Sequence, residues 1–296
     1  MSIATIQTAQ IIPEPAESYH RRSEISRGML WDFFESPRLY EGRYVLKTIP
    51  PKEPTPAMKK GSLAHAALLE PETVAARYAA MPRYELDPEN CTKSGDRSKS
   101  TATKYYEAKK EAFELQHADK TITDLDSLDM VRGMAESLAR ECGPWLQVDG
   151  MVERTITWTH EGTGLPMRCR PDWMRFTKRN TVIGFDLKGT ADPKPRFFRS
   201  RIEEGLWLQA AHYSEGMAAA LGMEVDAFFF VAVEFDQPHR CCVYQLDPQS
   251  MREAREARER LLYDLALALG SNSWADPQEG KVTSVCVRDF AFKRGE

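Results

Sequence analysis

The sequence lacks any apolar run that approaches the roughly 20 residues a membrane-spanning helix needs. Residues 1–20 have neither a basic n-region nor a continuous apolar h-region, so we do not expect a secretory signal peptide. We interpret this segment as a mobile N-terminal leader. These absences predict a soluble, cytoplasmic protein that has no membrane partner.

Cysteine is scarce, and the six cysteines show no C-x-x-C spacing. Cys241 and Cys242 are adjacent, so on a strand their side chains would point to opposite faces. The pattern favours reduced thiols over disulfides. It also argues against a cysteine-ligated zinc or iron–sulfur site.

A positive net charge is missing too: the chain carries −4, which taken alone disfavours a nucleic-acid partner. DNA responds to local potential, however, and two segments are locally basic. Residues 91–110 hold six Lys or Arg against two acids, and residues 193–201 hold no acid. The basic residues of the second segment are Lys194, Arg196, Arg199 and Arg201. Each segment is either a solvated loop or a phosphate-binding surface.

Hydrophobic periodicity divides the chain into a helical first half and a second half that contains strands. We expect helices over residues 23–36, 61–70, 72–80, 101–118, 123–141, 203–221 and 248–269, and a loop over 88–100. We expect strands over residues 152–158, 166–176, 181–188, 226–234 and 240–245. Short connections predict that the first three strands form a meander. The order predicts an α/β (α+β) fold with a helical N-terminal part.

Asp186 and Lys188 stand two residues apart in an apolar strand, so their side chains share one face. Hairpin pairing with the preceding strand would bring Asp172 beside Asp186. Two adjacent carboxylates repel each other and are natural ligands for Mg²⁺, to which the Leu187 carbonyl could add a ligand. Lys188 could then orient a water molecule. A plain Asp–Lys ion pair is the alternative.

Asp172 followed by Asp186-x-Lys188 resembles the signature of the PD-(D/E)xK nucleases. The segments GSLAHAALLEP, RCRPDW, FDLKGTAD and LQAAHY resemble the exonuclease subgroup that includes the RecB nuclease domain, lambda exonuclease and exonuclease VIII (RecE). The resemblance extends over roughly residues 24–235. It implies a restriction-endonuclease-like core: a central mixed sheet flanked by helices. Residues 21–296 would form one such domain, helical to about residue 147 and with the sheet core from about 148.

The resemblance also implies roles for single residues. His65, in a G-x-x-x-H motif, would be a metal ligand beside Asp172 and Asp186. Glu153 would bind metal or order a water molecule, and Gln209 and Tyr213, a Q-x-x-x-Y motif, would support the site. Arg168 and Arg170 could contact phosphate, with salt bridges as their competing use. Taken alone, each of these residues also has an ordinary structural interpretation, such as a packed core histidine for His65.

The implied activity is a Mg²⁺-dependent double-strand DNA exonuclease, with Mn²⁺ able to substitute, that runs 5′ to 3′ and produces 3′ single strands for recombination. Its partners would be double-stranded DNA ends, a single-strand annealing protein of the RecT type, and further copies of the chain in a homo-oligomeric ring. The alternatives are a structure-specific or single-strand nuclease of the same fold and a catalytically silent DNA-binding module. No G-x-x-x-x-G-K-[ST] motif is present, so we expect no ATP-driven unwinding.

Overall fold

The computed structural model describes residues 9–146, 150–276 and 279–282, and at its centre is a five-stranded sheet in the order β10-β9-β8-β7-β4. Its strands are β4 (Gly150–Val152), β7 (Trp173–Phe176), β8 (Val182–Thr190), β9 (Val225–Glu234) and β10 (Cys241–Tyr244). β8 and β9 pair in parallel, and the other neighbours pair antiparallel. The expected mixed sheet flanked by helices is therefore confirmed.

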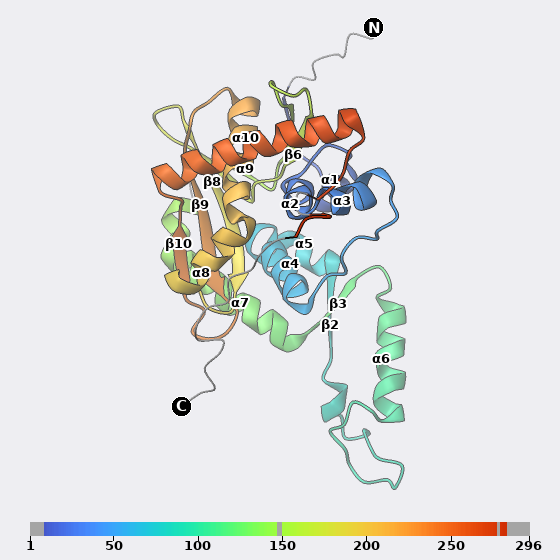
Figure 1. Ribbon diagram of the computed structural model, residues 1–296. Helices are drawn as coiled ribbons and strands as arrows, with labels where there is room; N and C mark the ends of the chain where they lie inside the picture. The colour runs from blue at the N-terminus through green and yellow to red at the C-terminus, as the bar shows by residue number, and fades with distance from the viewer. Residues whose placement is uncertain (1–8, 147–149, 277–278, 283–296) are drawn as a thin grey trace, which may run out of the picture.

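Helices cover both faces of this sheet (Figure 1). Helices α2 (Arg27–Glu35), α9 (Trp207–Leu221) and α10 (Pro248–Ser271) lie on one side, and α4 (Pro56–Leu69) and α7 (Leu125–Leu146) lie on the other. Successive residues of β9 alternate between two cores: Phe230 belongs to the first and Val231 to the second. A strand buried on both faces needs a continuous apolar run, which is what FFFVAV supplies.

The expected three-strand meander is present in its pairing, since the first segment pairs antiparallel with the second and the second with the third. The first two segments are each interrupted, however, and so contribute strands to two sheets. Residues 152–158 divide into the end of β4 and β5 (Thr155–Thr159), and residues 166–176 divide into β6 (Pro166–Cys169) and β7. β5 and β6 join β1 (Gln10–Ile12) in a separate sheet, in the order β1-β5-β6. Pro171 cannot donate to a ladder, and Glu153 has a left-handed backbone with a φ of 50°.

The two breaks lie together, because the Glu153 N–H donates to the Asp172 carbonyl at 3.0 Å. β1 and α1 (Ala16–Arg21) also differ from the expected mobile leader, since β1 pairs with β5. Residues 1–8 of that leader lie outside the described residues.

An arm projects from the body of the protein (Figure 1). It leaves through β2 (Tyr78–Met81), passes η2 (Tyr84–Leu86) and α6 (Lys104–Gln116), and returns through β3 (Thr121–Asp124), which pairs with β2 in parallel. The helix expected at 72–80 ends early, as α5 (Pro71–Arg77), and residues 78–81 form β2. Neither β2 nor β3 was expected from local pattern, because each strand is stabilised by a partner about 40 residues away along the chain.

Other boundaries follow local signals. Ser26 accepts a hydrogen bond from the Met29 N–H and so caps α2. The helix expected at 203–221 begins at Trp207, because Gly205 has a φ of 115° and ends the π-helical turn η3 (Ile202–Leu206). The remaining elements are α3 (Pro37–Tyr40), η1 (Glu41–Val45) and α8 (Pro195–Arg201).

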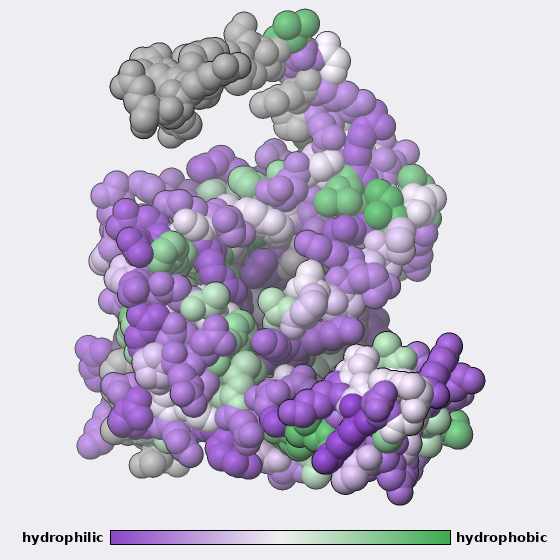
Figure 2. Space-filling model, turned by 90° about the horizontal axis from the view of Figure 1, so that it is seen from below, coloured by the Kyte–Doolittle hydropathy of each residue, from purple (hydrophilic) through white to green (hydrophobic). Residues whose placement is uncertain are grey.

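The surface of the described protein is mostly hydrophilic. Seen from below, it is hollowed near its centre, and hydrophilic residues surround the hollow (Figure 2). Within the described residues, we find no helix with the length and apolar character needed to span a bilayer.

Candidate active site

Strand β8 brings Asp186 and Lys188 to one face of the sheet, as their spacing predicts. Asp186 is only 2% exposed, and its Oδ2 lies 2.5 Å from Lys188 Nζ. Its Oδ1 accepts a hydrogen bond from Gln209 Nε2 on α9. Apart from the lysine, Asp186 Oδ2 has no hydrogen-bond partner, so a buried oxygen with spare acceptor capacity faces the site.

Asp172 lies next to Asp186 because β7 pairs with β8, with Trp173 opposite Phe185. Asp172 Oδ2 accepts a hydrogen bond from the Leu187 N–H at 2.6 Å, which fixes the carboxylate against β8. The expected hairpin geometry between these two aspartates is therefore present.

His65 reaches the same point from α4. Its Nε2 lies 2.9 Å from the Leu187 carbonyl, and its Nδ1 lies 3.4 Å from Asp172 Oδ2. The Leu187 carbonyl, expected as a metal ligand, thus accepts a hydrogen bond from the imidazole in this arrangement. The bond turns His65 Nδ1 toward the carboxylates.

The residues present fit a hard divalent cation. His65, Glu153 and Asp172 place one ligand atom each within 4.8 Å of one another. Glu153, which the resemblance offered as a metal ligand or a water-ordering group, stands in this cluster where we expected Asp186. The left-handed backbone at Glu153 and its hydrogen bond to Asp172 hold it there. Two carboxylates and an imidazole suit Mg²⁺ or Mn²⁺.

The electrostatics show how much charge the site concentrates. Burial raises the pKa of Asp172 to about 8, and the neighbouring carboxylates Asp186 and Glu153 add to the rise. Burial opposes protonation of His65, but the nearby carboxylates, Asp172 foremost, outweigh it and raise its pKa to about 9. The described groups therefore retain a proton that a cation would displace.

These residues line a cleft of about 1290 Å³. Its walls come from α1, α2, α4, β8 and α9, and they carry several cations. The cationic residues are Arg27, Lys60, Arg77, Arg168, Arg170, Lys188 and Arg201. An acidic protein thus has a local excess of basic side chains around its carboxylate cluster.

Residues 37–281 match the family model described as "PDDEXK-like domain of unknown function (DUF3799)". The chain belongs to this family. No curated protein matches it.

Two solved structures resemble this chain to different degrees, and only the first shares its fold. One is the crystal structure of a "Putative exonuclease" from Eubacterium rectale, which is 12% identical, covers 96% of this chain and 100% of its own, and has a TM-score of 0.54. Another, of the protein SSO0001, is 15% identical over 59% of this chain and 73% of its own. Its TM-score of 0.29 is too low to indicate a shared fold. The family and the first structure together support a nuclease-like domain.

Helix α9 of this PDDEXK-like domain presents Gln209 and Tyr213 to the cleft, four residues apart on one helix face. Gln209 is 3% exposed and fixes Asp186, as a supporting residue would. Its Oε1 accepts a hydrogen bond from Arg27 Nη2 at 3.3 Å. Arg27 was not among the expected site residues, because the sequence around it predicted only a helix over 23–36.

Arg168 and Arg170 are buried, and their guanidinium groups bind within the protein. Arg170 Nε lies 2.6 Å from Glu153 Oε2, and its Nη1 donates to the Glu14 carbonyl at 2.7 Å. Arg168 donates to the Arg22 carbonyl and lies over the Tyr19 ring at 4.9 Å. The structure therefore shows the salt-bridge alternative for Arg170, which holds Glu153 in place.

The basic stretch 193–201 forms helix α8, which was not expected. Only Arg201 of its four cations lines the cleft, and it donates to the Gly189 carbonyl at 2.9 Å. Arg196 and Arg199 are exposed, and Lys194 lies 3.6 Å from Asp192. Lys194, Arg196 and Arg199 are therefore not part of the cleft lining.

Proposed function

We propose that this protein is a Mg²⁺-dependent double-strand DNA exonuclease that works 5′ to 3′. The observation that carries the proposal is the juxtaposition of His65, Glu153 and Asp172 with the Asp186–Lys188 pair in one cationic cleft. A purely structural ion pair would not need three potential metal ligands beside it. Here the buried Asp186 Oδ2 also accepts no hydrogen bond apart from its contact with Lys188.

The chain's own groups divide the work. His65, Glu153 and Asp172 would hold the metal, and Asp186 would complete its surroundings. The bound metal would supply a Lewis acid for phosphodiester hydrolysis. Gln209 and Arg170 keep Asp186 and Glu153 in position. Lys188, whose ammonium already lies at the carboxylate cluster, would orient the attacking water and stabilise negative charge at the phosphate.

The polarity and the partners rest on the resemblance to the exonuclease VIII subgroup. By that resemblance the product would be a 3′ single strand, which a RecT-type annealing protein would take up. The active form would be a homo-oligomeric ring around DNA. The cations of the cleft support duplex DNA as the substrate, because a phosphate backbone needs local positive potential.

The test is digestion of linear and covalently closed circular duplex with and without Mg²⁺. We expect the linear DNA to be consumed and the circle to be spared. Linear duplex labelled at either the 5′ or the 3′ end then tests polarity, and early release of the 5′ label is expected. Cutting of the circle would instead indicate a structure-specific or single-strand endonuclease. If neither form is cut with Mg²⁺ or Mn²⁺, the protein is a silent DNA-binding module.

A further inference from the structure

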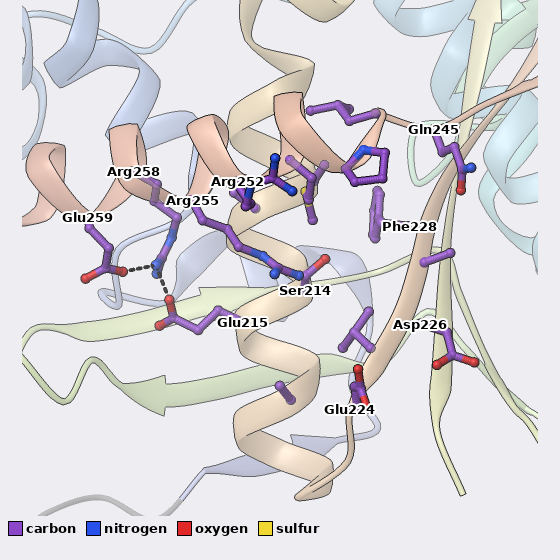
Figure 3. Close-up of a pocket in the computed structure, with 18 residues that line it drawn as sticks. Ser214, Glu215, Glu224, Asp226, Phe228, Gln245, Arg252, Arg255, Arg258 and Glu259 are labelled. Atoms are coloured by element: carbon purple, nitrogen blue, oxygen red, sulfur yellow. Dashed lines mark hydrogen bonds and ion pairs between the residues drawn. The ribbon is translucent and has the colours of Figure 1, made fainter. Parts of the chain in front are cut away.

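A second pocket, of about 730 Å³, lies between α9, α10 and the first part of β9 (Figure 3). It shares no lining residue with the cleft. Helix α9 separates the two, because Gln209 and Tyr213 face the cleft while Ala211, Ser214 and Ala218 face the pocket. With 3.6 residues per turn, these two sets occupy different sides of the helix.

Two buried polar atoms of the lining residues lack a hydrogen-bond partner. One is the Ser214 hydroxyl, on a residue only 3% exposed, and the other is Nη2 of Arg258, which is 1% exposed. Arg258 uses its other nitrogens to bind Glu215, Glu259 and His212. A buried polar group without a partner is destabilising, so two of them at one pocket point to a ligand that would satisfy them.

The free charge at this end of the pocket is positive. Arg252 and Arg255 precede Arg258 at three-residue intervals on α10, so all three reach the pocket. Across the described residues, neither Arg252 nor Arg255 forms an ion pair, whereas the acids Glu215 and Glu259 are paired with Arg258. The side chains of Arg255 and Ser214 point toward one another (Figure 3).

The opposite wall is apolar. Phe228, which is 4% exposed, lies there with Val225 and Leu246, and Met251 adds an apolar side chain from α10. Gln245 and Glu224 add polar groups at the rim (Figure 3). The volume of this pocket is in the range of binding sites for small organic ligands. A bare inorganic anion would fill only part of it.

We infer that this pocket binds a small phosphate monoester with a planar organic body, the chemical class of a nucleoside monophosphate. The phosphate takes the guanidinium groups of Arg252 and Arg255 together with the two unpartnered atoms, the Ser214 hydroxyl and Arg258 Nη2, because guanidinium forks match phosphate oxygens. The planar body lies against Phe228 and Leu246. This site goes beyond the proposed nuclease activity, and ligand binding there requires neither cleavage nor metal.

The test is isothermal titration calorimetry of the full chain with deoxyadenosine monophosphate in metal-free buffer, so that its readout is independent of nuclease activity. The test variant is Arg252→Gln with Arg255→Gln. The control is Arg260→Gln, because Arg260 is exposed on the same helix, pairs with Glu256 and lies outside the pocket. We expect one site in the wild type and in the control. The double variant should bind at least about tenfold more weakly, because it loses charge-assisted hydrogen bonds.

Deoxyadenosine and inorganic phosphate complete the experiment. Each should bind more weakly than the monophosphate, since each lacks half of the proposed contacts. Absence of monophosphate binding by the wild type would overturn the inference. Equal binding by the double variant would also overturn it, since the ligand would then be held in another place, such as the cleft. Inorganic phosphate binding as tightly as the monophosphate would refute the proposed ligand class.

Discussion

At Asp172, burial and the neighbouring carboxylates act in the same direction on the pKa. The carboxylate is 7% exposed and lies beside Asp186 and Glu153, all of which favours its neutral form. A site that needed only stability would replace such a group with an uncharged one. The presence of Asp172 in this cluster therefore favours a bound cation over a purely structural role.

The first prediction concerns this pair of aspartates. Asp172→Ala and Asp186→Ala should each abolish Mg²⁺-dependent cleavage while leaving the fold intact, because each removes a carboxylate from the cluster. Turnover of labelled duplex, with circular dichroism as a check on folding, measures this. The matched control is Asp129→Ala, which removes an exposed carboxylate near the start of α7. Near wild-type turnover in either site variant would make the assignment wrong.

Lys188→Ala should fail in a different way. Lys188 contacts Asp186 but is itself positively charged, so we do not expect it to be a metal ligand. Metal affinity should therefore survive, while the cleavage rate falls by roughly 10²-fold or more. Calorimetry with Mn²⁺ and single-turnover kinetics separate the two effects. A variant that no longer binds Mn²⁺ would contradict this division of roles.

The pH dependence of stability provides a third prediction. The pKa values of Asp172 and His65 are raised to about 8 and about 9 in the folded protein, so both groups bind protons more tightly there than in the unfolded chain. Their stabilisation is therefore fully present below their unfolded pKa values and is lost as the pH rises through about 8 and 9. In metal-free buffer the melting temperature should fall over this range, and Mg²⁺ should restore it.

Asp172→Asn is the matching variant. It removes one raised pKa and the main cause of the other, so its melting temperature should fall less between neutral pH and about pH 9. Thermal denaturation in EDTA across a pH series measures the difference. A wild type that loses no more stability than Asp172→Asn would show that these two groups do not titrate as inferred.

At the scale of elements, helix α9 links the parts of the molecule. It fixes Asp186 through Gln209, lines the second pocket through Ser214, and packs on β5 and β6 of the smaller sheet. That packing is close at Gly216, where an added Cβ would lie 2.7 Å from both Cys169 Sγ and a ring carbon of Trp158.

Gly216→Ala should therefore destabilise the protein by about 1–3 kcal/mol, since buried neighbours must move to admit the methyl group. Gly61→Ala on α4 is the matched control: a Cβ there meets nothing within 4 Å. At a helical position without a clash, alanine should add up to about 1 kcal/mol. Urea denaturation of both variants measures the two shifts. Equal stability of Gly216→Ala and the wild type would mean that α9 can shift away from the smaller sheet at little cost in free energy.

At the scale of the whole molecule, the net charge of −4 does not favour DNA, so the proposed nuclease would need local basic surfaces to bind it. Two candidates remain from the sequence: helix α8, next to the cleft, and the arm tip with Lys93, Arg97 and Lys99. Arg201 is partly buried against Gly189, so the exposed α8 cations are Arg196 and Arg199.

Arg196→Gln with Arg199→Gln should weaken duplex binding and flatten its salt dependence by up to about two units of slope, roughly one per lost phosphate contact. Neutralising Lys93, Arg97 and Lys99 together should leave the slope unchanged. Binding across a salt series in Ca²⁺, expected to support binding without cleavage, measures both. The reverse result would move the DNA path from α8 to the arm.

The sequence alone determined the features that depend on local spacing. Residues two apart on a strand share a face, which placed Asp186 beside Lys188, and residues four apart on a helix do the same for Gln209 and Tyr213. The apolar run over residues 226–234 predicted the strand β9. The resemblance added the family and the residues that gather around Asp172.

Only the tertiary structure decided the features that depend on distant partners. The meander divided into two sheets because Pro171 and Glu153 interrupt its strands and because β1, from the expected leader, supplies a new partner for β5. That division places Glu153 in the candidate metal site, where it forms an ion pair with Arg170. The contact of Arg27 with Gln209 and the second pocket likewise form where segments far apart along the chain meet. Burial and pairing energies there depend on neighbours that no local pattern specifies.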